Sequence, residues 1–168
     1  MTRWRAPAER KSPYITPEGF ARLQAELQSL WTRRAEVTRA LAAAAAEGDR
    51  SENAEYIYRK KELREIDRRI RYLQKRIPDL QVVVQPAHEP TRVYFGCWVT
   101  LQDSESREVV YRIVGPDEFD PGKGWISMDS PVALALMRKT VDDEVSVATP
   151  NGLAHYDIVA IRHEQPPE

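Results

Sequence analysis

The first half of the chain carries a hydrophobic pattern with the spacing of an amphipathic helix. Between residues 20 and 44 the seam positions recur at alternating intervals of three and four, with one arginine among them: Phe20, Leu23, Leu27, Leu30, Arg34, Val37, Leu41 and Ala44. This spacing is typical of a coiled coil. Thr16-Pro17 is a start signal, because threonine caps free amides and proline suits the first helical position. Alanines 42–46 extend the helix, and Gly48 is a stop signal.

A second pattern of the same spacing follows at Tyr56, Arg59, Leu63, Ile66, Ile70, Leu73, Ile77 and Leu80. When the first series is read forward and the second backward, the residue numbers in each of the eight pairs, from 20 with 80 to 44 with 56, sum to 100. Two helices folded back about residue 50 would place every seam position opposite its counterpart. The sequence therefore predicts an antiparallel coiled-coil hairpin, roughly 45 Å long at 1.5 Å per residue.

The pattern changes after residues 84–92, a segment with two prolines and no periodicity that we interpret as a linker. Short runs of β-branched and aromatic residues follow, separated by turn signals such as Asn151-Gly152. Ser130-Pro131 starts a short helix over residues 132–139. The expected strands are 93–101, 109–114, 125–128, 145–149 and 154–161. The predicted fold class is α+β: a helical hairpin over residues 14–83, then an antiparallel-sheet domain with one helix over residues 93–168.

Composition adds an uneven distribution of charge. The 168 residues have a formal net charge of −1 and 30% charged side chains. Residues 1–15 and 16–80 each carry +3, whereas residues 81–168 carry −7. This asymmetry suggests that the first half faces a polyanion. Residues 1–13 are expected to form a flexible basic arm, in which Arg3, Arg5, Arg10 and Lys11 either contact nucleic acid or an acidic protein, or have no fixed partner.

Several function classes find no support in the sequence. No run approaches eighteen apolar residues, so no membrane span is expected, and the start of the chain lacks the apolar stretch of a signal peptide. The single cysteine, Cys97, excludes an internal disulfide, suits a cytoplasmic location and is expected in the core. The histidines lack metal-site spacing, and there is no glycine-rich phosphate loop. We therefore expect no self-contained enzyme active site.

Asp49 and Glu52 lie in the predicted turn of the hairpin, within Gly48-Asp49-Arg50-Ser51-Glu52-Asn53. Their spacing permits two interpretations. In one, Asp49 is the N-cap of the second helix and Glu52 completes a capping box. In the other, the two carboxylates hold a hard cation such as Mg²⁺, with further ligands supplied by a partner.

The second helix is rich in basic residues from Arg59 to Arg76. Glu62, Glu65 and Asp67 offset only part of this charge. The residues form either a solvated face with ion pairs along the helix or a surface that contacts phosphates.

The motif Gly48-Asp49-Arg50-Ser51-Glu52-Asn53-Ala54-Glu55-Tyr56 resembles the tip of the bacterial Gre transcript-cleavage factors. The stretch from Lys61 to Leu73 is similar to the GreB branch, as are Thr16-Pro17-Glu18-Gly19-Phe20, Phe95-Gly96-Cys97-Trp98-Val99, Tyr111-Arg112-Ile113-Val114-Gly115 and Ile126-Ser127-Met128-Asp129-Ser130-Pro131. The resemblance covers about residues 14 to 163. One departure is Ala35, where the family pattern has a proline, so the first helix is expected to run without a kink.

This resemblance implies that the sheet domain is FKBP-like and docks on a coiled coil of the polymerase β′ subunit through Asp129, Ser130 and Pro131. The hairpin would enter the secondary channel of RNA polymerase as a monomer. There Asp49 and Glu52, supported by Ser51 and Asn53, would help hold the second Mg²⁺ while the polymerase cleaves backtracked RNA. Candidates for guiding the RNA 3′ end are Arg59, Lys60, Arg64, Arg68 and Arg71.

Two other functions remain open at this point. A channel-occupying inhibitor with the same fold would bind polymerase without promoting cleavage, although both tip acids are present here. A peptidyl-prolyl isomerase would share the FKBP-like domain, but fold alone is weak support for function.

Overall fold

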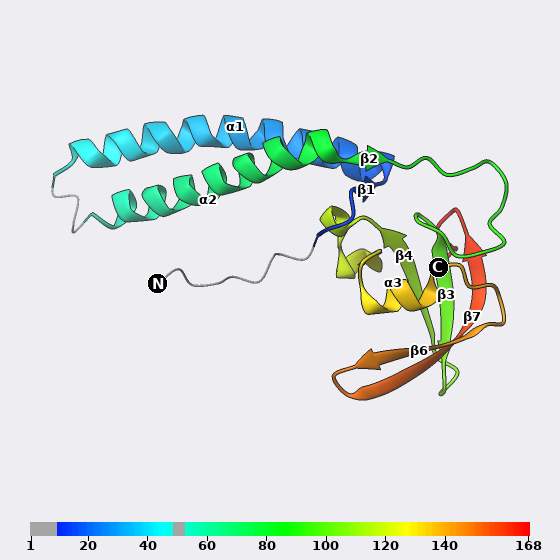
Figure 1. Cartoon of the computed structure of the whole chain (residues 1–168). Helices are drawn as coiled ribbons and strands as arrows, with labels where there is room; N and C mark the ends of the chain where they lie inside the picture. Colours follow the sequence, from blue (N-terminus) through cyan, green and yellow to red (C-terminus); the bar gives the residue numbers. More distant parts are fainter. Residues whose placement is uncertain (1–9, 49–52) are drawn as a thin grey trace, which may run out of the picture. The chain divides into compact units, whose positions relative to one another are not determined.

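The computed structural model describes residues 10–48 and 53–168 (Figure 1). These residues form two compact units. One is the helical segment Glu18–Leu80; the other combines residues 10–17 with residues 81–168. The hairpin is thus inserted, along the chain, between the first residues of the second unit and the rest of it. The expected fold class, a helical hairpin followed by a small sheet domain with one helix, is confirmed.

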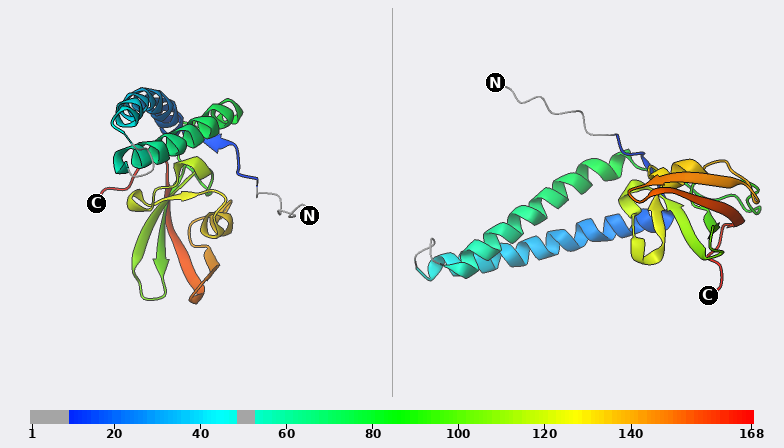
Figure 2. Two further views of the ribbon diagram at one scale, coloured as in Figure 1. Left: turned by 90° about the vertical axis from the view of Figure 1, so that its left-hand side faces the viewer. Right: turned by 90° about the horizontal axis from the view of Figure 1, so that it is seen from below.

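The hairpin consists of α1 (Pro17–Ala46) and α2 (Ala54–Arg76), which run antiparallel and side by side in all views (Figures 1 and 2). A 3₁₀ turn, η1 (Ile77–Asp79), extends α2. Every residue of the eight expected seam pairs is buried or half-buried. The central cluster of Val37, Ile66 and Ile70 has Leu27, Leu30 and Leu63 packed against it. The seam prediction is therefore confirmed.

The ends of α1 also follow the sequence signals. The helix begins at Pro17 and ends two residues before Gly48. It continues without interruption through Ala35, as expected in the absence of a proline.

Ion pairs between the helices flank the seam. Arg34 Nε donates to Asp67 Oδ1 over 2.7 Å, and Arg69 Nε donates to Glu26 Oε1 over 2.6 Å. Glu62 accepts hydrogen bonds from Arg33 across the seam and from Arg59 on its own helix. The hydrogen bond from Arg33 is the largest cause of a lowered pKa for the Glu62 carboxyl. These contacts add register-specific attraction along a seam that is otherwise apolar.

The second unit contains a curled five-stranded sheet of order β5-β4-β3-β7-β6 (Figure 2). Its strands are β3 (Trp98–Asp103), β4 (Glu108–Val114), β5 (Trp125–Ser127), β6 (Glu144–Thr149) and β7 (Gly152–Arg162). Two 3₁₀ turns, η2 (Pro116–Glu118) and η3 (Pro121–Lys123), connect β4 to β5. β5 pairs parallel with β4, so the expectation of an antiparallel sheet throughout is wrong at this edge.

The core of this domain lies between the sheet and the short helix α3 (Pro131–Leu136). Ala133 and Leu136 of α3 are fully buried there. Cys97 is 1% exposed, as expected for a core residue, and burial raises the pKa of its thiol. α3 is shorter than the predicted helix because the backbone leaves the helical region at Met137, whose ψ is 129°, and Arg138 follows with a φ of +67°.

Two sequence predictions in the sheet domain need correction. Residues 93–97 form no strand, because Gly96 has a φ of +86° and turns the chain before Trp98. The hairpin between β6 and β7 is confirmed, but its two loop residues are Pro150 and Asn151, with Gly152 paired to Thr149.

A small parallel sheet was not predicted. β1 (Tyr14–Ile15) pairs with β2 (Gln81–Val82), immediately before and after the hairpin. The expected boundaries at residues 14 and 83 therefore differ from the observed ones, since both strands belong to the unit that contains the sheet domain. Residues 1–9 of the expected flexible arm lie outside the described residues, so that expectation stays a prediction. At the end of the arm, Ser12 and Pro13 are hydrogen-bonded within that unit.

Candidate functional site

The tip carboxylates lie outside the described residues. Asp49, Ser51 and Glu52 belong to residues 49–52, so their expected roles stay predictions. The residues on either side are described, and they show how the two helix ends are held.

Asn53 joins the end of α1 to the start of α2. Its side-chain Nδ2 donates to the carbonyl of Ala44 over 2.7 Å, and its Oδ1 accepts from the Tyr56 amide over 3.1 Å. Asn53 is thus the N-cap of α2, which begins at Ala54. The interpretation of Asp49 as N-cap with Glu52 in a capping box is wrong, because both precede this cap. The role of Asn53 that the structure shows is to fix both ends of the turn.

Most of the basic residues of α2 fall into two groups. Arg59 donates to Glu55 over 2.8 Å and to Glu62 over 3.0 Å, and Arg69 pairs with Glu26. Arg69 thus joins α2 to α1, whereas the ion pairs of Arg59 lie within α2. Lys60 is exposed and lies over the ring of Tyr56, 5.8 Å from its centroid.

The second group is an exposed line of basic residues that we call the basic row: Lys61, Arg64, Arg68, Arg71 and Lys75. Their spacing of three and four places them on one face of α2, away from the seam. None of the five forms an ion pair with another described residue. Sequence reasoning had included Arg59 among the RNA-guiding candidates and left out Lys61 and Lys75. Counting from the seam positions would have separated the two groups.

The predicted docking residues lie at the start of α3. Ser130 is its N-cap, with its hydroxyl accepting from the Ala133 amide over 3.3 Å, and Pro131 is its first residue. Asp129 and Pro131 are exposed, and so is Leu134, at 64%. The Asp129 amide donates to Ser127 Oγ over 3.1 Å. The loop is therefore held by its own hydrogen bonds and presents a carboxylate beside apolar side chains.

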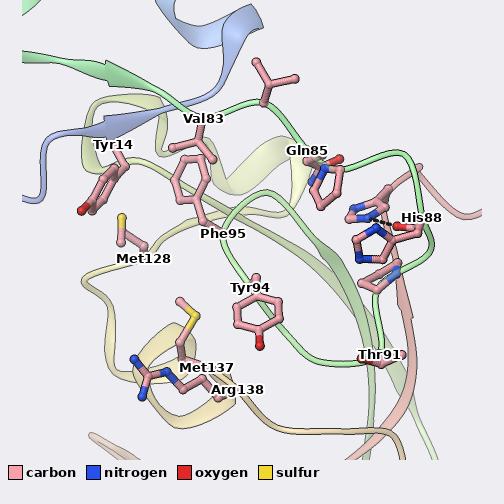
Figure 3. Close-up of a pocket in the computed structure, with 14 residues that line it drawn as sticks. Tyr14, Val83, Gln85, His88, Thr91, Tyr94, Phe95, Met128, Met137 and Arg138 are labelled. Carbon is pink, nitrogen blue, oxygen red and sulfur yellow. Dashed lines mark hydrogen bonds between the residues drawn. The ribbon is translucent and has the colours of Figure 1, made fainter.

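An apolar pocket of about 530 Å³ adjoins this loop (Figure 3). Met128, the residue before Asp129, lies beside Tyr14 at one end, and His88 lies at the other. Tyr94, 52% exposed, and Phe95 also line it. Residues 84–92, which the sequence predicts to be a linker, also form part of the pocket wall, since Gln85, His88 and Thr91 line the pocket.

Two absences concern only the described part of the chain. Among residues 10–48 and 53–168, the side chains of His, Cys, Asp and Glu nowhere gather in threes as a metal site requires. Neither long helix in these ranges has the length and hydropathy that a bilayer crossing needs.

Comparison with known proteins identifies the class. The family described as "Transcription elongation factor, N-terminal" matches residues 13–82, and "Transcription elongation factor, GreA/GreB, C-term" matches residues 87–163. The chain belongs to the GreA/GreB family of transcription elongation factors.

The relatives specify the branch. A protein of Xanthomonas axonopodis pv. citri named transcription elongation factor GreB is 59% identical over 96% of this chain and 97% of its own length. A GreB of Pseudomonas aeruginosa is 54% identical over 99% of this chain and 100% of its own. The expected GreB type is thereby confirmed. GreA factor homolog 1 of Thermus thermophilus, a solved structure, is 26% identical over 91% of this chain and 99% of its own, with a TM-score of 0.42.

Proposed function

We propose that this elongation factor binds RNA polymerase, enters its secondary channel and stimulates the polymerase's own cleavage of backtracked RNA. The observation that carries the proposal is the motif of residues 48–56 placed where an antiparallel hairpin turns back. The chain supplies carboxylates to a reaction centre that belongs to the polymerase, so it has no need of an active site of its own.

Asp49 and Glu52 are the proposed catalytic residues. Carboxylate oxygens are the ligands that Mg²⁺ prefers, but two of them leave most of its coordination shell to other groups. We therefore assign the remaining ligands to the polymerase and its RNA. A bound Mg²⁺ at such a centre activates water and stabilises the leaving oxygen. Ser51 supports the acids in this proposal, while Asn53 fixes the chain directly after Glu52 through its bond to the Ala44 carbonyl.

The basic row guides the extruded RNA in this proposal. Its five side chains are exposed and carry no competing ion pairs among the described residues. From Lys61 to Lys75 the row extends about 21 Å along α2 at 1.5 Å per residue. Arg59 is a weaker candidate than the row, because Glu55 and Glu62 already engage its guanidinium.

Docking is assigned to Asp129, Ser130 and Pro131 together with the adjoining pocket. A carboxylate next to an apolar hollow can receive both a hydrogen-bond donor and an apolar side chain from one partner surface. The β′ coiled coil is the proposed partner surface.

The decisive experiment removes the tip charges without changing the shape of the side chains. The double variant Asp49→Asn/Glu52→Gln should lower cleavage in stalled polymerase complexes by about a hundredfold or more, because the metal loses two anionic ligands. Polymerase binding should stay within about twofold of the parent, because the docking residues are intact. It is measured by competition with a labelled parent chain.

The control is Glu47→Gln, which removes one exposed charge from the same end of the hairpin. It should cleave at the parent rate. If the double variant also cleaves at the parent rate, the tip acids have no catalytic role. If the parent chain binds polymerase but never stimulates cleavage, the inhibitor alternative is correct.

A further inference from the structure

The carboxylate of the docking residue Asp129 is already bound within the chain. The backbone amide of Ser12 donates to Asp129 Oδ2 over 2.9 Å, and the Ser12 hydroxyl donates to Asp129 Oδ1. The two residues are 117 positions apart in sequence. Each oxygen of this exposed carboxylate therefore has a fixed donor.

Ser12 is itself fixed by bonds that do not involve Asp129. The next residue, Pro13, accepts at its carbonyl from the Gln81 amide over 2.8 Å, and the Ile15 carbonyl accepts from the Val83 amide over 2.9 Å. The Thr16 amide donates to the buried carboxylate of Glu118 over 3.0 Å. The segment Ser12–Thr16 is thus anchored on the sheet domain, and it presents the Ser12 donors at a defined place.

The same segment also forms part of the pocket beside the docking loop. Tyr14 lines the pocket near Met128 (Figure 3), and its ring lies 6.3 Å from that of Phe95. A Cβ atom at Gly115 would lie 2.0 Å from the Tyr14 carbonyl oxygen, so only glycine permits this approach. Tyr14 and Ser12 therefore border the pocket and the carboxylate that we assign to docking.

We propose that the segment Ser12–Thr16 is part of the polymerase-docking surface, with Ser12 as the positioning residue for Asp129. The inference rests on the docking role proposed above. A carboxylate has about four lone-pair sites, so two hydrogen bonds from Ser12 leave one site on each oxygen for a partner. Ser12 fixes the direction of those free sites without neutralising the charge. The partner surface that fits offers a hydrogen-bond donor to Asp129 and an apolar side chain to the pocket.

The test measures RNA cleavage against factor concentration with the full-length chain and stalled polymerase complexes. Ser12→Ala should raise the concentration for half-maximal cleavage about threefold to tenfold, as expected for the loss of one hydrogen bond to a docking carboxylate. The maximal rate should not change, because the tip is intact. Ser12→Thr keeps the hydroxyl and should restore the parent concentration. Ser12→Asp places a like charge against Asp129 and should weaken docking further than Ser12→Ala.

A matched control and a double-variant cycle separate positioning from a general loss of stability. Ser104→Ala removes an exposed hydroxyl from the turn between β3 and β4 and should have no effect. In an Asp129→Ala background, Ser12→Ala should add less than about a twofold change, because the residue that it positions is gone. Additive effects of the two substitutions would overturn the positioning role, and so would a Ser12→Ala chain that docks as well as the parent or better.

The Asp129→Ala variant distinguishes the two proposals. If it weakens docking while Ser12→Ala does not, the inference about Ser12 fails and the docking assignment stands. If Asp129→Ala docks like the parent, the docking assignment fails and the inference fails with it.

Discussion

At the scale of single residues, Asn53 shows why the sequence alone did not identify the N-cap of α2. Asp49, Ser51 and Asn53 are all good N-cap residues, so propensity could not choose among them. The asparagine side chain has an oxygen that accepts from the Tyr56 amide and a separate NH₂ group that donates to the Ala44 carbonyl. An aspartate carboxylate has no donor, and serine would have to make both bonds through one oxygen atom. The choice also depends on a contact of Asn53 with α1, which N-cap propensity does not take into account.

Two substitutions at Asn53 separate its two bonds. Asn53→Ala removes both and should destabilise the hairpin ends by about 1–2 kcal/mol. Asn53→Asp keeps the acceptor at the start of α2 but loses the donor to Ala44, so we expect a loss of about 1 kcal/mol. Amide hydrogen exchange at Tyr56 and Ile57 measures the effect locally. Unchanged protection of both amides in Asn53→Ala would show that the cap adds nothing to the stability of the turn.

At the scale of elements, the hairpin was predictable because its information is local and repeated. Each seam position is constrained by the residues three and four away, and Ala35 sits in an uninterrupted helix. The sheet domain was less predictable because its pairings are distant. β5 has only three residues and joins β4 in parallel, and β1 finds its partner across the whole hairpin. Neither pairing can be inferred from the local pattern of hydrophobic residues.

The parts of the candidate site also differ in how well the sequence predicts them. The basic row follows from helical periodicity, since its members are spaced regularly from the seam. The link between Ser12 and Asp129 could not be predicted, because serine and aspartate at exposed positions are common and carry no spacing signal. The full burial of Glu118 could not be predicted either, because a single glutamate carries no spacing signal in the sequence.

The basic row gives a prediction at the element scale. Arg68→Gln should reduce rescue of long backtracks about threefold or more at physiological salt, because each phosphate contact adds a salt-dependent increment to binding. Rescue of short backtracks, which extrude less RNA, should change less. Arg39→Gln is the control, since it removes an exposed charge from α1 instead of α2. The measurement is cleavage rate as a function of backtrack length and salt concentration. Equal losses from the two substitutions would count against a guiding role for the row.

At the scale of the whole molecule, Glu118 connects the beginning of the described chain with its middle. Its carboxylate accepts from the Thr16 amide, the Thr16 hydroxyl and, over 2.8 Å, the Gly115 amide. All three groups are held in the interior, where an unpaired donor is costly. This cluster and the β1–β2 pairing fasten both chain segments that flank the hairpin to the unit of the sheet domain.

Removing this carboxylate should destabilise the sheet-domain unit and leave the stability of the helical unit Glu18–Leu80 unchanged. Glu118→Ala should destabilise the sheet-domain unit by roughly 2–4 kcal/mol, because three buried donors lose their acceptor. Glu118→Gln, which keeps one acceptor oxygen, should cost less. Proteolysis after Arg10 and Lys11 and amide exchange in β1 report on the sheet-domain unit. Amide exchange in the centre of α2 reports on the helical unit. Equal loss of protection in both places would show that they unfold as one.

The insertion of the hairpin also bears on how the protein is made. Glu118 follows Thr16 by 102 residues, so the segment around β1 leaves the ribosome long before its acceptor exists. The two helices, whose contacts are comparatively local, can close their seam in the meantime, because nascent chains fold as their units emerge. A polypeptide released before Glu118 and Asp129 are translated would therefore contain the two helices of the hairpin but lack the proposed docking residues. Translation therefore produces the hairpin, to which we assign the catalytic residues, before the domain to which we assign docking.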